Sequence, residues 1–152
     1  MVLTGLSVLK IDHRKIVLSV NLIKSNKMRV LNKQYRGKDK TTDVLSFSYV
    51  KNGKLSNVEL LRFIKKEKIT ELGDVFIDPS VAGKQVQHHF FVQKSGAGQA
   101  RGGSHSLEYE FAMLTTHGLL HLLGYDHERS KKDEKRMFDL QNKVLSTFKF
   151  VK

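Results

Sequence analysis

The chain has 152 residues, 39% of them hydrophobic, which is enough for one domain with a buried core and excludes a largely disordered protein. It contains no cysteine, so disulfides and thiolate metal sites are excluded, and a metal would need His, Asp or Glu ligands. The net charge is +12, and residues 1–40 contain ten basic and two acidic side chains. This charge favours a polyanionic partner such as a nucleic acid, although a lysine-rich surface that serves only solubility is the alternative.

No stretch reaches the ~20 apolar residues of a membrane span, and the first nine residues lack the basic leader of a signal peptide. No long basic amphipathic helix indicates binding to a membrane surface. We therefore expect a soluble, cytoplasmic protein with no membrane partner.

The first half of the chain predicts alternating strands and helices. Residues 15–23 are β-branched and apolar, as in a strand. Residues 25–36 predict a helix that Gly37 ends, and residues 42–50 alternate like a half-buried strand. Asn52-Gly53 then predicts a turn.

Ser56 and Glu59 have the spacing of a capping box and predict the start of another helix. Residues 72–77 predict a short strand, and Pro79 is typical of the first turn of a further helix. Between about 94 and 104, four glycines among small and polar residues predict a flexible loop. It could act as a lid or as an RNA-contacting arm, but we favour a passive insertion.

Residues 107–123 predict a strongly apolar helix that ends at Gly124, and a last helix is expected from about Ser130. The side chains that this last helix is expected to bury are Met137, Leu140, Val144 and Phe148. The order of elements suggests an α+β or a layered α/β domain. We favour a single α+β domain over residues 1–152, with a small mixed sheet packed against helices and a central helix that carries histidines.

Three of the seven histidines fall in the segment HGLLHLLGYDH. His117 and His121 are four residues apart on the predicted helix, so their rings project from one face. Gly124 can end the helix in a left-handed conformation, after which the chain can return with His127. Three imidazoles that leave a fourth position for water form the ligand set of a catalytic zinc site.

This spacing equals that of the metzincin motif H-E-x-x-H-x-x-G-x-x-H, except that Gly118 replaces the glutamate that acts as general base in those proteases. Ordinary peptide hydrolysis therefore lacks its proton acceptor. A phosphodiester is a better substrate, because zinc and cationic side chains can stabilise its negative charge. Asp126 could serve as base or orient an imidazole, or it could have only a capping or surface role.

The histidine block resembles the H-G-x-L-H-L-x-G-Y-D-H signature of the YbeY family of zinc-dependent, single-strand-specific endoribonucleases. Residues 31–47 (LNKQYRGKDKTTDVLSF), residues 72–74 (LGD) and Glu110 are similar to further parts of the family pattern. The resemblance implies zinc on His117, His121 and His127 and an active-site role for Arg36. It also implies a function in the maturation of ribosomal RNA, with the small ribosomal subunit and its proteins as partners.

Arg36 also has a physical case, because a guanidinium can hold phosphate oxygens with two parallel hydrogen bonds. For Asp43 we expect first a turn or capping role. Three positions depart from the family pattern: Thr41 and Ser48 stand where prolines are usual, and Gln141 where an acid is common.

We thus predict a one-zinc endoribonuclease that cleaves single-stranded RNA and acts in ribosomal RNA maturation and ribosome quality control. Its catalytic residues are expected to be Arg36, His117 and His121. The alternative is a non-catalytic, zinc-stabilised RNA-binding factor in ribosome assembly. A metzincin-like protease is a third interpretation, which Gly118 and the positive charge disfavour.

Overall fold

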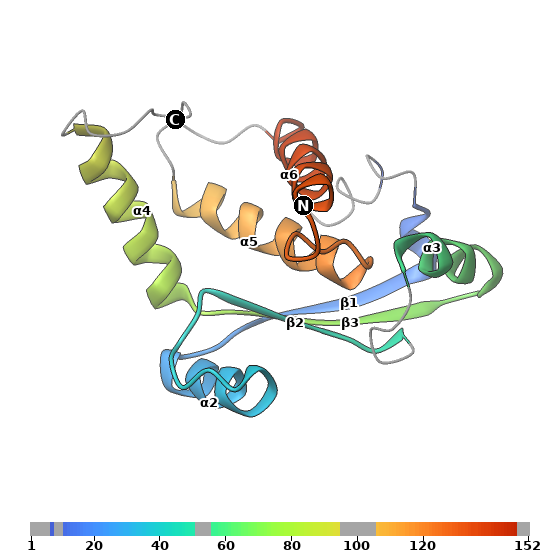
Figure 1. The fold of residues 1–152 in the computed structure, drawn as a ribbon, viewed down its shortest axis with the longest axis horizontal. Helices are drawn as coiled ribbons and strands as arrows, with labels where there is room; N and C mark the ends of the chain where they lie inside the picture. Colours follow the sequence, from blue (N-terminus) through green and yellow to red (C-terminus); the bar gives the residue numbers. More distant parts are fainter. Residues whose placement is uncertain (1–6, 8–10, 51–55, 95–105, 149–152) are drawn as a thin grey trace.

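The computed structural model of the chain describes residues 7, 11–50, 56–94 and 106–148 (Figure 1). The elements follow one another in the order η1 (His13–Lys15), β1 (Ile16–Leu22), α2 (Ser25–Arg36), β2 (Val44–Ser48), α3 (Asn57–Lys66), β3 (Thr70–Ile77), α4 (Pro79–Lys94), α5 (Leu107–Leu122) and α6 (Lys131–Leu145). The turn predicted at Asn52-Gly53 and the glycine-rich loop from residue 95 onward lie outside the described residues. In the described part of the chain, no helix is both long and apolar enough to cross a membrane.

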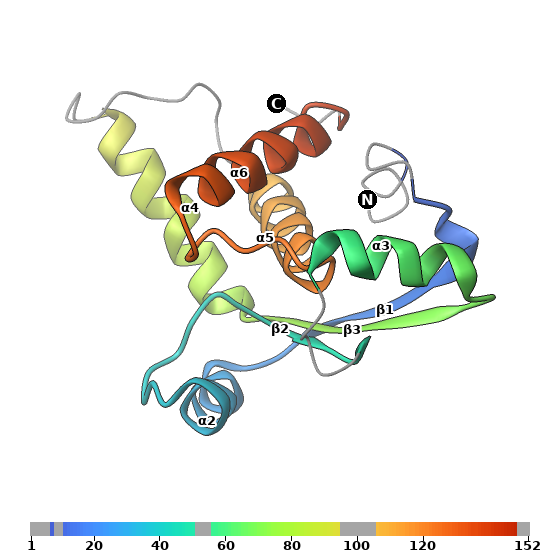
Figure 2. The ribbon, with the colours of Figure 1, turned by 45° about the vertical axis from the view of Figure 1, so that its right-hand side comes forward.

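The sheet has three strands in the order β1-β3-β2, with β3 parallel to β1 and antiparallel to β2. Leu22 of β1 and Val44 of β2 both pair with Ile77, the last residue of β3. The chain therefore passes from β1 through α2 to β2 at one end of the sheet, where α2 lies in both views (Figures 1 and 2). The expected α+β domain with a small mixed sheet is confirmed.

Short-range signals in the sequence determine where the helices begin and end. The hydroxyls of Ser56, Ser106 and Ser130 each accept a hydrogen bond from the backbone N–H three residues further on, at the starts of α3, α5 and α6. At α3 the predicted capping box is complete, because Glu59 also binds back to the backbone of Ser56. Gly37 ends α2 in a left-handed conformation, with φ 68°.

Helix α5 is the central helix of the domain. It contacts β2, β3, α4 and α6. Both views show it between the sheet and α6 (Figures 1 and 2). Nine of its sixteen residues are buried, which explains why its sequence is apolar nearly all round rather than along one stripe. The two histidines that α5 carries are thereby held on a rigid element.

Helix α6 differs from the prediction in the residues that it buries. Its buried face consists of Met137, Gln141, Val144 and Leu145. These positions lie on one side of a helix because they are spaced by three and four residues. Leu140 and Phe148 are only partly buried, so the expectation that they would belong to the core was wrong for these two.

Candidate metal centre and its pocket

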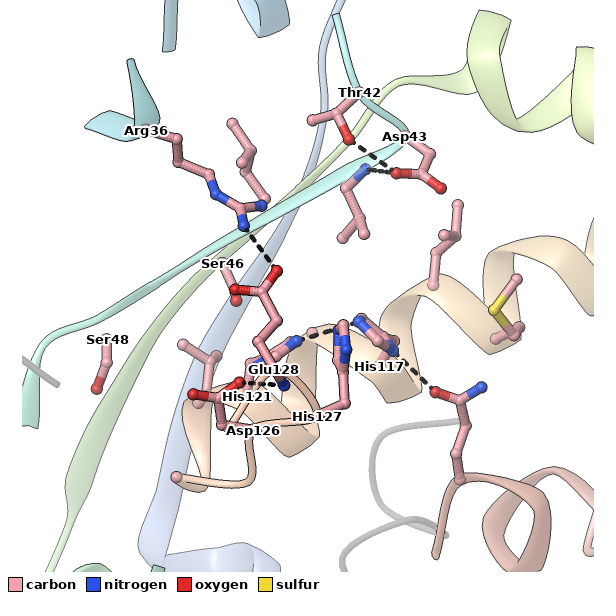
Figure 3. Close-up of a pocket in the computed structure, with 18 of the residues that line it drawn as sticks. Arg36, Thr42, Asp43, Ser46, Ser48, His117, His121, Asp126, His127 and Glu128 are labelled. Atoms are coloured by element: carbon pink, nitrogen blue, oxygen red, sulfur yellow. Dashed lines mark hydrogen bonds and ion pairs between the residues drawn. The ribbon is translucent and has the colours of Figure 1, made fainter. Parts of the chain in front are cut away.

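The three histidines of the predicted ligand set come together. One ring nitrogen from each of His117, His121 and His127 lies within 4.8 Å of the other two, and the Nε2 atoms of His117 and His121 are 3.1 Å apart (Figure 3). Each side chain is half-buried. In the described part of the chain this is the one group of three or more His, Asp or Glu side chains that could hold a metal ion.

The return of the chain to His127 depends on the residues just after α5. Gly124 has φ 81°, and its N–H donates to the carbonyl of His121 while Tyr125 N–H donates to that of Leu120. These bonds close the helix end and reverse the chain. Asp126 then accepts hydrogen bonds from Glu128 N–H at 2.9 Å and from Arg129 Nε at 3.0 Å.

The hydrogen bonds of Asp126 lie within this turn, and its side chain also lines the pocket of the histidines. The hydrogen bond from Glu128 N–H holds the pKa of Asp126 below its usual value, so the carboxylate is ionised. This turn places His127 opposite the two histidines of α5.

Burial makes the two helical histidines neutral at physiological pH. It lowers the pKa of His117, and it lowers the pKa of His121 to about 4, with the charges of the neighbouring histidines acting in the same direction. A neutral imidazole keeps a nitrogen lone pair, which is the form that binds metal. Three close, half-buried imidazoles therefore fit a metal ion.

Gln141 of α6 determines which nitrogen of His117 is available. Its Oε1 lies 3.0 Å from His117 Nδ1, and the Gln141 side chain is 6% exposed. With the amide in this orientation its oxygen accepts from Nδ1–H, which places the lone pair of the neutral ring on Nε2, the atom that faces His121. Gln141, which stands where the family pattern commonly has an acid, thus orients the imidazole of His117 through its amide.

The histidines lie in a cavity of about 640 Å³ that also holds the predicted Arg36. Arg36, the last residue of α2, directs its guanidinium into the pocket, with Nη2 3.3 Å from Glu128 Oε1 (Figure 3). Lys38 and Arg129 add two further cations to the lining. Arg36 was predicted from the sequence; Glu128, its partner, was not.

Residues around the start of β2 form a hydrogen-bonded wall of the pocket. The carboxylate of Asp43 accepts bonds from Val44 N–H, the Thr42 hydroxyl and the Gln85 amide, so it connects the start of β2 to α4. Thr41, at the position of the usual proline, donates its hydroxyl to the buried Asp78.

Asp78 joins this wall to helix α4. It accepts hydrogen bonds from Ser80 and Val81 N–H at the start of α4, and its own N–H donates to the Asp43 carbonyl. Burial alone would raise the pKa of Asp78, but the hydrogen bonds that it accepts outweigh burial and lower it.

Glu110, which the resemblance included, is buried two helical turns before His117. It is 2% exposed, and its Oε1 has no hydrogen-bond partner among the described residues. Burial, and then the charge of Asp43, raises the pKa of Glu110 to about 6. Glu110 does not line the pocket, so this acid lies behind the site rather than in it.

The structure gives a reason for Gly118, the position where the metzincin motif has glutamate. A Cβ at this position would lie 2.7 and 2.9 Å from the two methyl groups of Val75 on β3. Residue 118 therefore faces the sheet rather than the histidines, and there is no room for a side chain. Helix α5 gains close packing on β3, and a general base cannot come from this position.

The sequence interpretation missed Phe138 as a pocket residue. Its ring lies 5.7 Å from that of His127 and 6.4 Å from that of His117, both at 31°. The signal was available in the spacing, because Phe138 precedes Gln141 by three residues and so lies beside it on α6.

Fold and site together define a class: a small α+β domain in which three histidines could hold one metal ion in an open pocket lined by cations. The chain matches the family model described as Endoribonuclease YbeY over residues 3–149, and it belongs to that family.

Curated relatives agree with this assignment, and a solved structure agrees with the fold. The chain is 37% identical over 131 residues to an endoribonuclease YbeY of Oceanobacillus iheyensis, covering 86% of this chain and 73% of that protein. It is 39% identical over 129 residues to the Aquifex aeolicus endoribonuclease YbeY, with 85% and 68% covered. A solution structure of a Thermotoga maritima protein is similar in fold, with a TM-score of 0.52 and 24% identity over 94% of this chain and 75% of that one.

Proposed function

We propose that the protein is a zinc-dependent endoribonuclease that cleaves single-stranded RNA, and that residues 1–152 act as one such domain. One observation carries the proposal: three close imidazoles lie in the same pocket as the guanidinium of Arg36. A metal-ligating group beside a phosphate-binding group can activate water and stabilise the negative charge that develops when a phosphodiester is hydrolysed. The family and the names of the curated relatives support the same activity.

His117, His121 and His127 would hold the metal. Three neutral nitrogen ligands and an open side favour zinc among the common divalent ions. Bound there, zinc supplies a Lewis acid that polarises the phosphate and makes water a stronger acid. Gln141 keeps Nε2 of His117 free of hydrogen for this role.

Arg36 would hold the scissile phosphate. Its present partner, the exposed Glu128, accepts a single hydrogen bond at 3.3 Å, which a phosphate can replace with two stronger ones. Lys38, in the same lining, adds attraction for the backbone of the RNA. These groups would bind the phosphate and orient it for attack.

The cellular substrate that we propose is ribosomal RNA, processed together with the small ribosomal subunit in the cytoplasm, with a further part in ribosome quality control. The support is the family resemblance and the charge of +12. An assembly factor with structural zinc would instead need a fourth protein ligand, and the histidine group offers three ligands within the described part of the chain. A protease would need the base that Gly118 has no room to provide.

The test is cleavage of labelled RNA by protein that has been stripped with a chelator and then reloaded with zinc. We expect cleavage of a single-stranded oligonucleotide only after reloading, much less cleavage of the same sequence as a duplex, and none of casein. Zinc-replete protein that binds RNA but cuts none, with or without small ribosomal subunits, would contradict the enzyme and support the assembly factor. Cleavage of casein would support the protease.

A further inference from the structure

Among the described residues, one aromatic side chain lines the pocket besides the histidines: Phe138, on the second turn of α6. Its neighbour Met137 is fully buried in the core, whereas Phe138 is 37% exposed. A large apolar ring that remains accessible inside a pocket that also holds cations and imidazoles gives a ligand an apolar surface to cover.

The surroundings of the ring limit the chemistry of that ligand. The rings of His127 and His117 lie 5.7 and 6.4 Å from that of Phe138, both at 31° to it, and Gln141 lies one helical turn away. Arg36 and Lys38 come from the opposite part of the fold, because α5 and the sheet lie between α2 and α6 in both views (Figures 1 and 2).

A molecule that uses both walls must carry an anion for the cations and a flat apolar surface for the ring. A nucleotide has both: the phosphate meets Arg36, and the base stacks on the phenyl ring. A free phosphate, or a peptide that offers only acidic side chains, would satisfy the cations and leave Phe138 uncovered.

We infer that Phe138 is the platform on which one nucleobase of the substrate stacks, and that it gives the site its preference for single strands. This inference rests on the proposed function. A base inside a duplex already has both faces stacked, so it cannot cover the ring unless it leaves the helix. Single-stranded RNA offers an unstacked base at no such cost.

The experiment combines a protein variant with an altered RNA. Single-turnover cleavage over a range of enzyme concentrations gives the rate and the half-saturating concentration for wild type, Phe138→Leu and Phe138→Trp. Each protein is tested on one single-stranded oligonucleotide and on versions with an abasic nucleotide at each position next to the cut. Leucine keeps an apolar side chain at position 138 but cannot stack a base, whereas tryptophan can.

We expect Phe138→Leu to raise the half-saturating concentration by about tenfold, and Phe138→Trp to keep or lower it. Removal of the base at one of these positions should raise the half-saturating concentration of wild type by about tenfold. The same abasic RNA should leave that of Phe138→Leu almost unchanged, because this variant has no ring for the base to stack on. The matched control is Phe63→Leu, which removes a ring packed on the core outside the pocket and should leave the abasic penalty unchanged.

Two results would overturn the inference while leaving the proposed function intact. In the first, abasic penalties in Phe138→Leu are as large as in wild type at every position. In the second, chelator competition shows that Phe138→Leu loses zinc in step with activity, so that the ring serves the histidines instead. If zinc-replete wild type cuts no RNA at all, the proposed function fails and the inference fails with it.

Discussion

Arg36 is the residue whose replacement separates binding from catalysis. Arg36→Lys keeps the positive charge but loses the two-pronged donor that fits a phosphate. We predict little change in zinc content or RNA affinity and a fall of ~10-fold or more in the single-turnover rate, about 1.4 kcal/mol of transition-state stabilisation.

Arg129→Lys is the matched control, because Arg129 lines the same pocket but is paired with Asp126. It should cleave at close to the wild-type rate. Wild-type single-turnover cleavage by Arg36→Lys would contradict the catalytic role, and weaker affinity at an unchanged rate would reduce Arg36 to a binding residue.

Glu110 predicts a pH dependence of stability. The pKa of Glu110 is about 6 in the folded protein, above the ordinary 4.5. Ionisation of this carboxyl group therefore lowers the free energy of unfolding. The loss is complete above pH 6 and vanishes when the pH is far below 4.5. Glu110→Gln should therefore raise the free energy of unfolding by up to about 2 kcal/mol at pH 8, and by less than half of that at pH 5. Urea unfolding of both proteins at the two pH values measures this, and a difference that does not vary with pH would contradict the assigned pKa.

At the scale of the element, α5 depends on its contact with β3. An alanine at Gly118 would place its Cβ against Val75, and overpacking of a core costs about 1–3 kcal/mol. We predict that Gly118→Ala lowers the melting temperature despite the better helix propensity of alanine, and that Val75→Ala added to it recovers part of the loss.

The chain offers an internal control for this change. A methyl group on Gly83 of α4 would meet no other atom within 4 Å, so Gly83→Ala should stabilise by up to about 1 kcal/mol. If Gly118→Ala stabilised the protein as much as Gly83→Ala, the close packing of α5 on β3 would be wrong.

Local signals in the sequence were enough to predict most elements. Ser56 with Glu59, Gly37 and Gly124 act within a few residues, and the structure has each of them at the predicted helix boundary. The three histidines could also be predicted, because a helical spacing of four and a return after glycine are local features.

Contacts between distant segments could not be predicted in the same way. Gln141 was noted only as a departure from a pattern, since nothing near it in sequence reveals that α6 places it 3.0 Å from His117. The same holds for Glu128 and Arg36, which are 92 positions apart, and for Gly118 against Val75. These contacts depend on how α5 packs against β3 and α6.

At the scale of the whole molecule, we expect the positive charges near α2 to contribute more to RNA binding than those near α3. Helix α2 and the loop after it lie at one end of the sheet, and α3 lies at the other (Figures 1 and 2). Replacing Lys33, Lys38 and Lys40 with glutamine should weaken RNA binding. It should also flatten the plot of log affinity against log salt by ~0.7 for each phosphate that the protein no longer neutralises.

The control removes the same charge at the other end. The exposed Lys65 and Lys66 of α3 and Lys68, just beyond its end, are changed to glutamine. This variant should keep a slope close to that of wild type. Equal slopes for both triple variants would mean that the RNA does not follow the α2 end of the molecule.

The most direct test of the central claim is the zinc content of wild type and His121→Ala after equilibration with zinc and removal of the excess. We predict one zinc per chain in wild type and in a control variant, His13→Ala, whose histidine is exposed on η1. His121→Ala should retain almost none, because two imidazoles bind zinc far more weakly than three, and its RNA cleavage should disappear with the metal. Full zinc occupancy in His121→Ala would show that the ion is held elsewhere and that the three histidines are not its ligands.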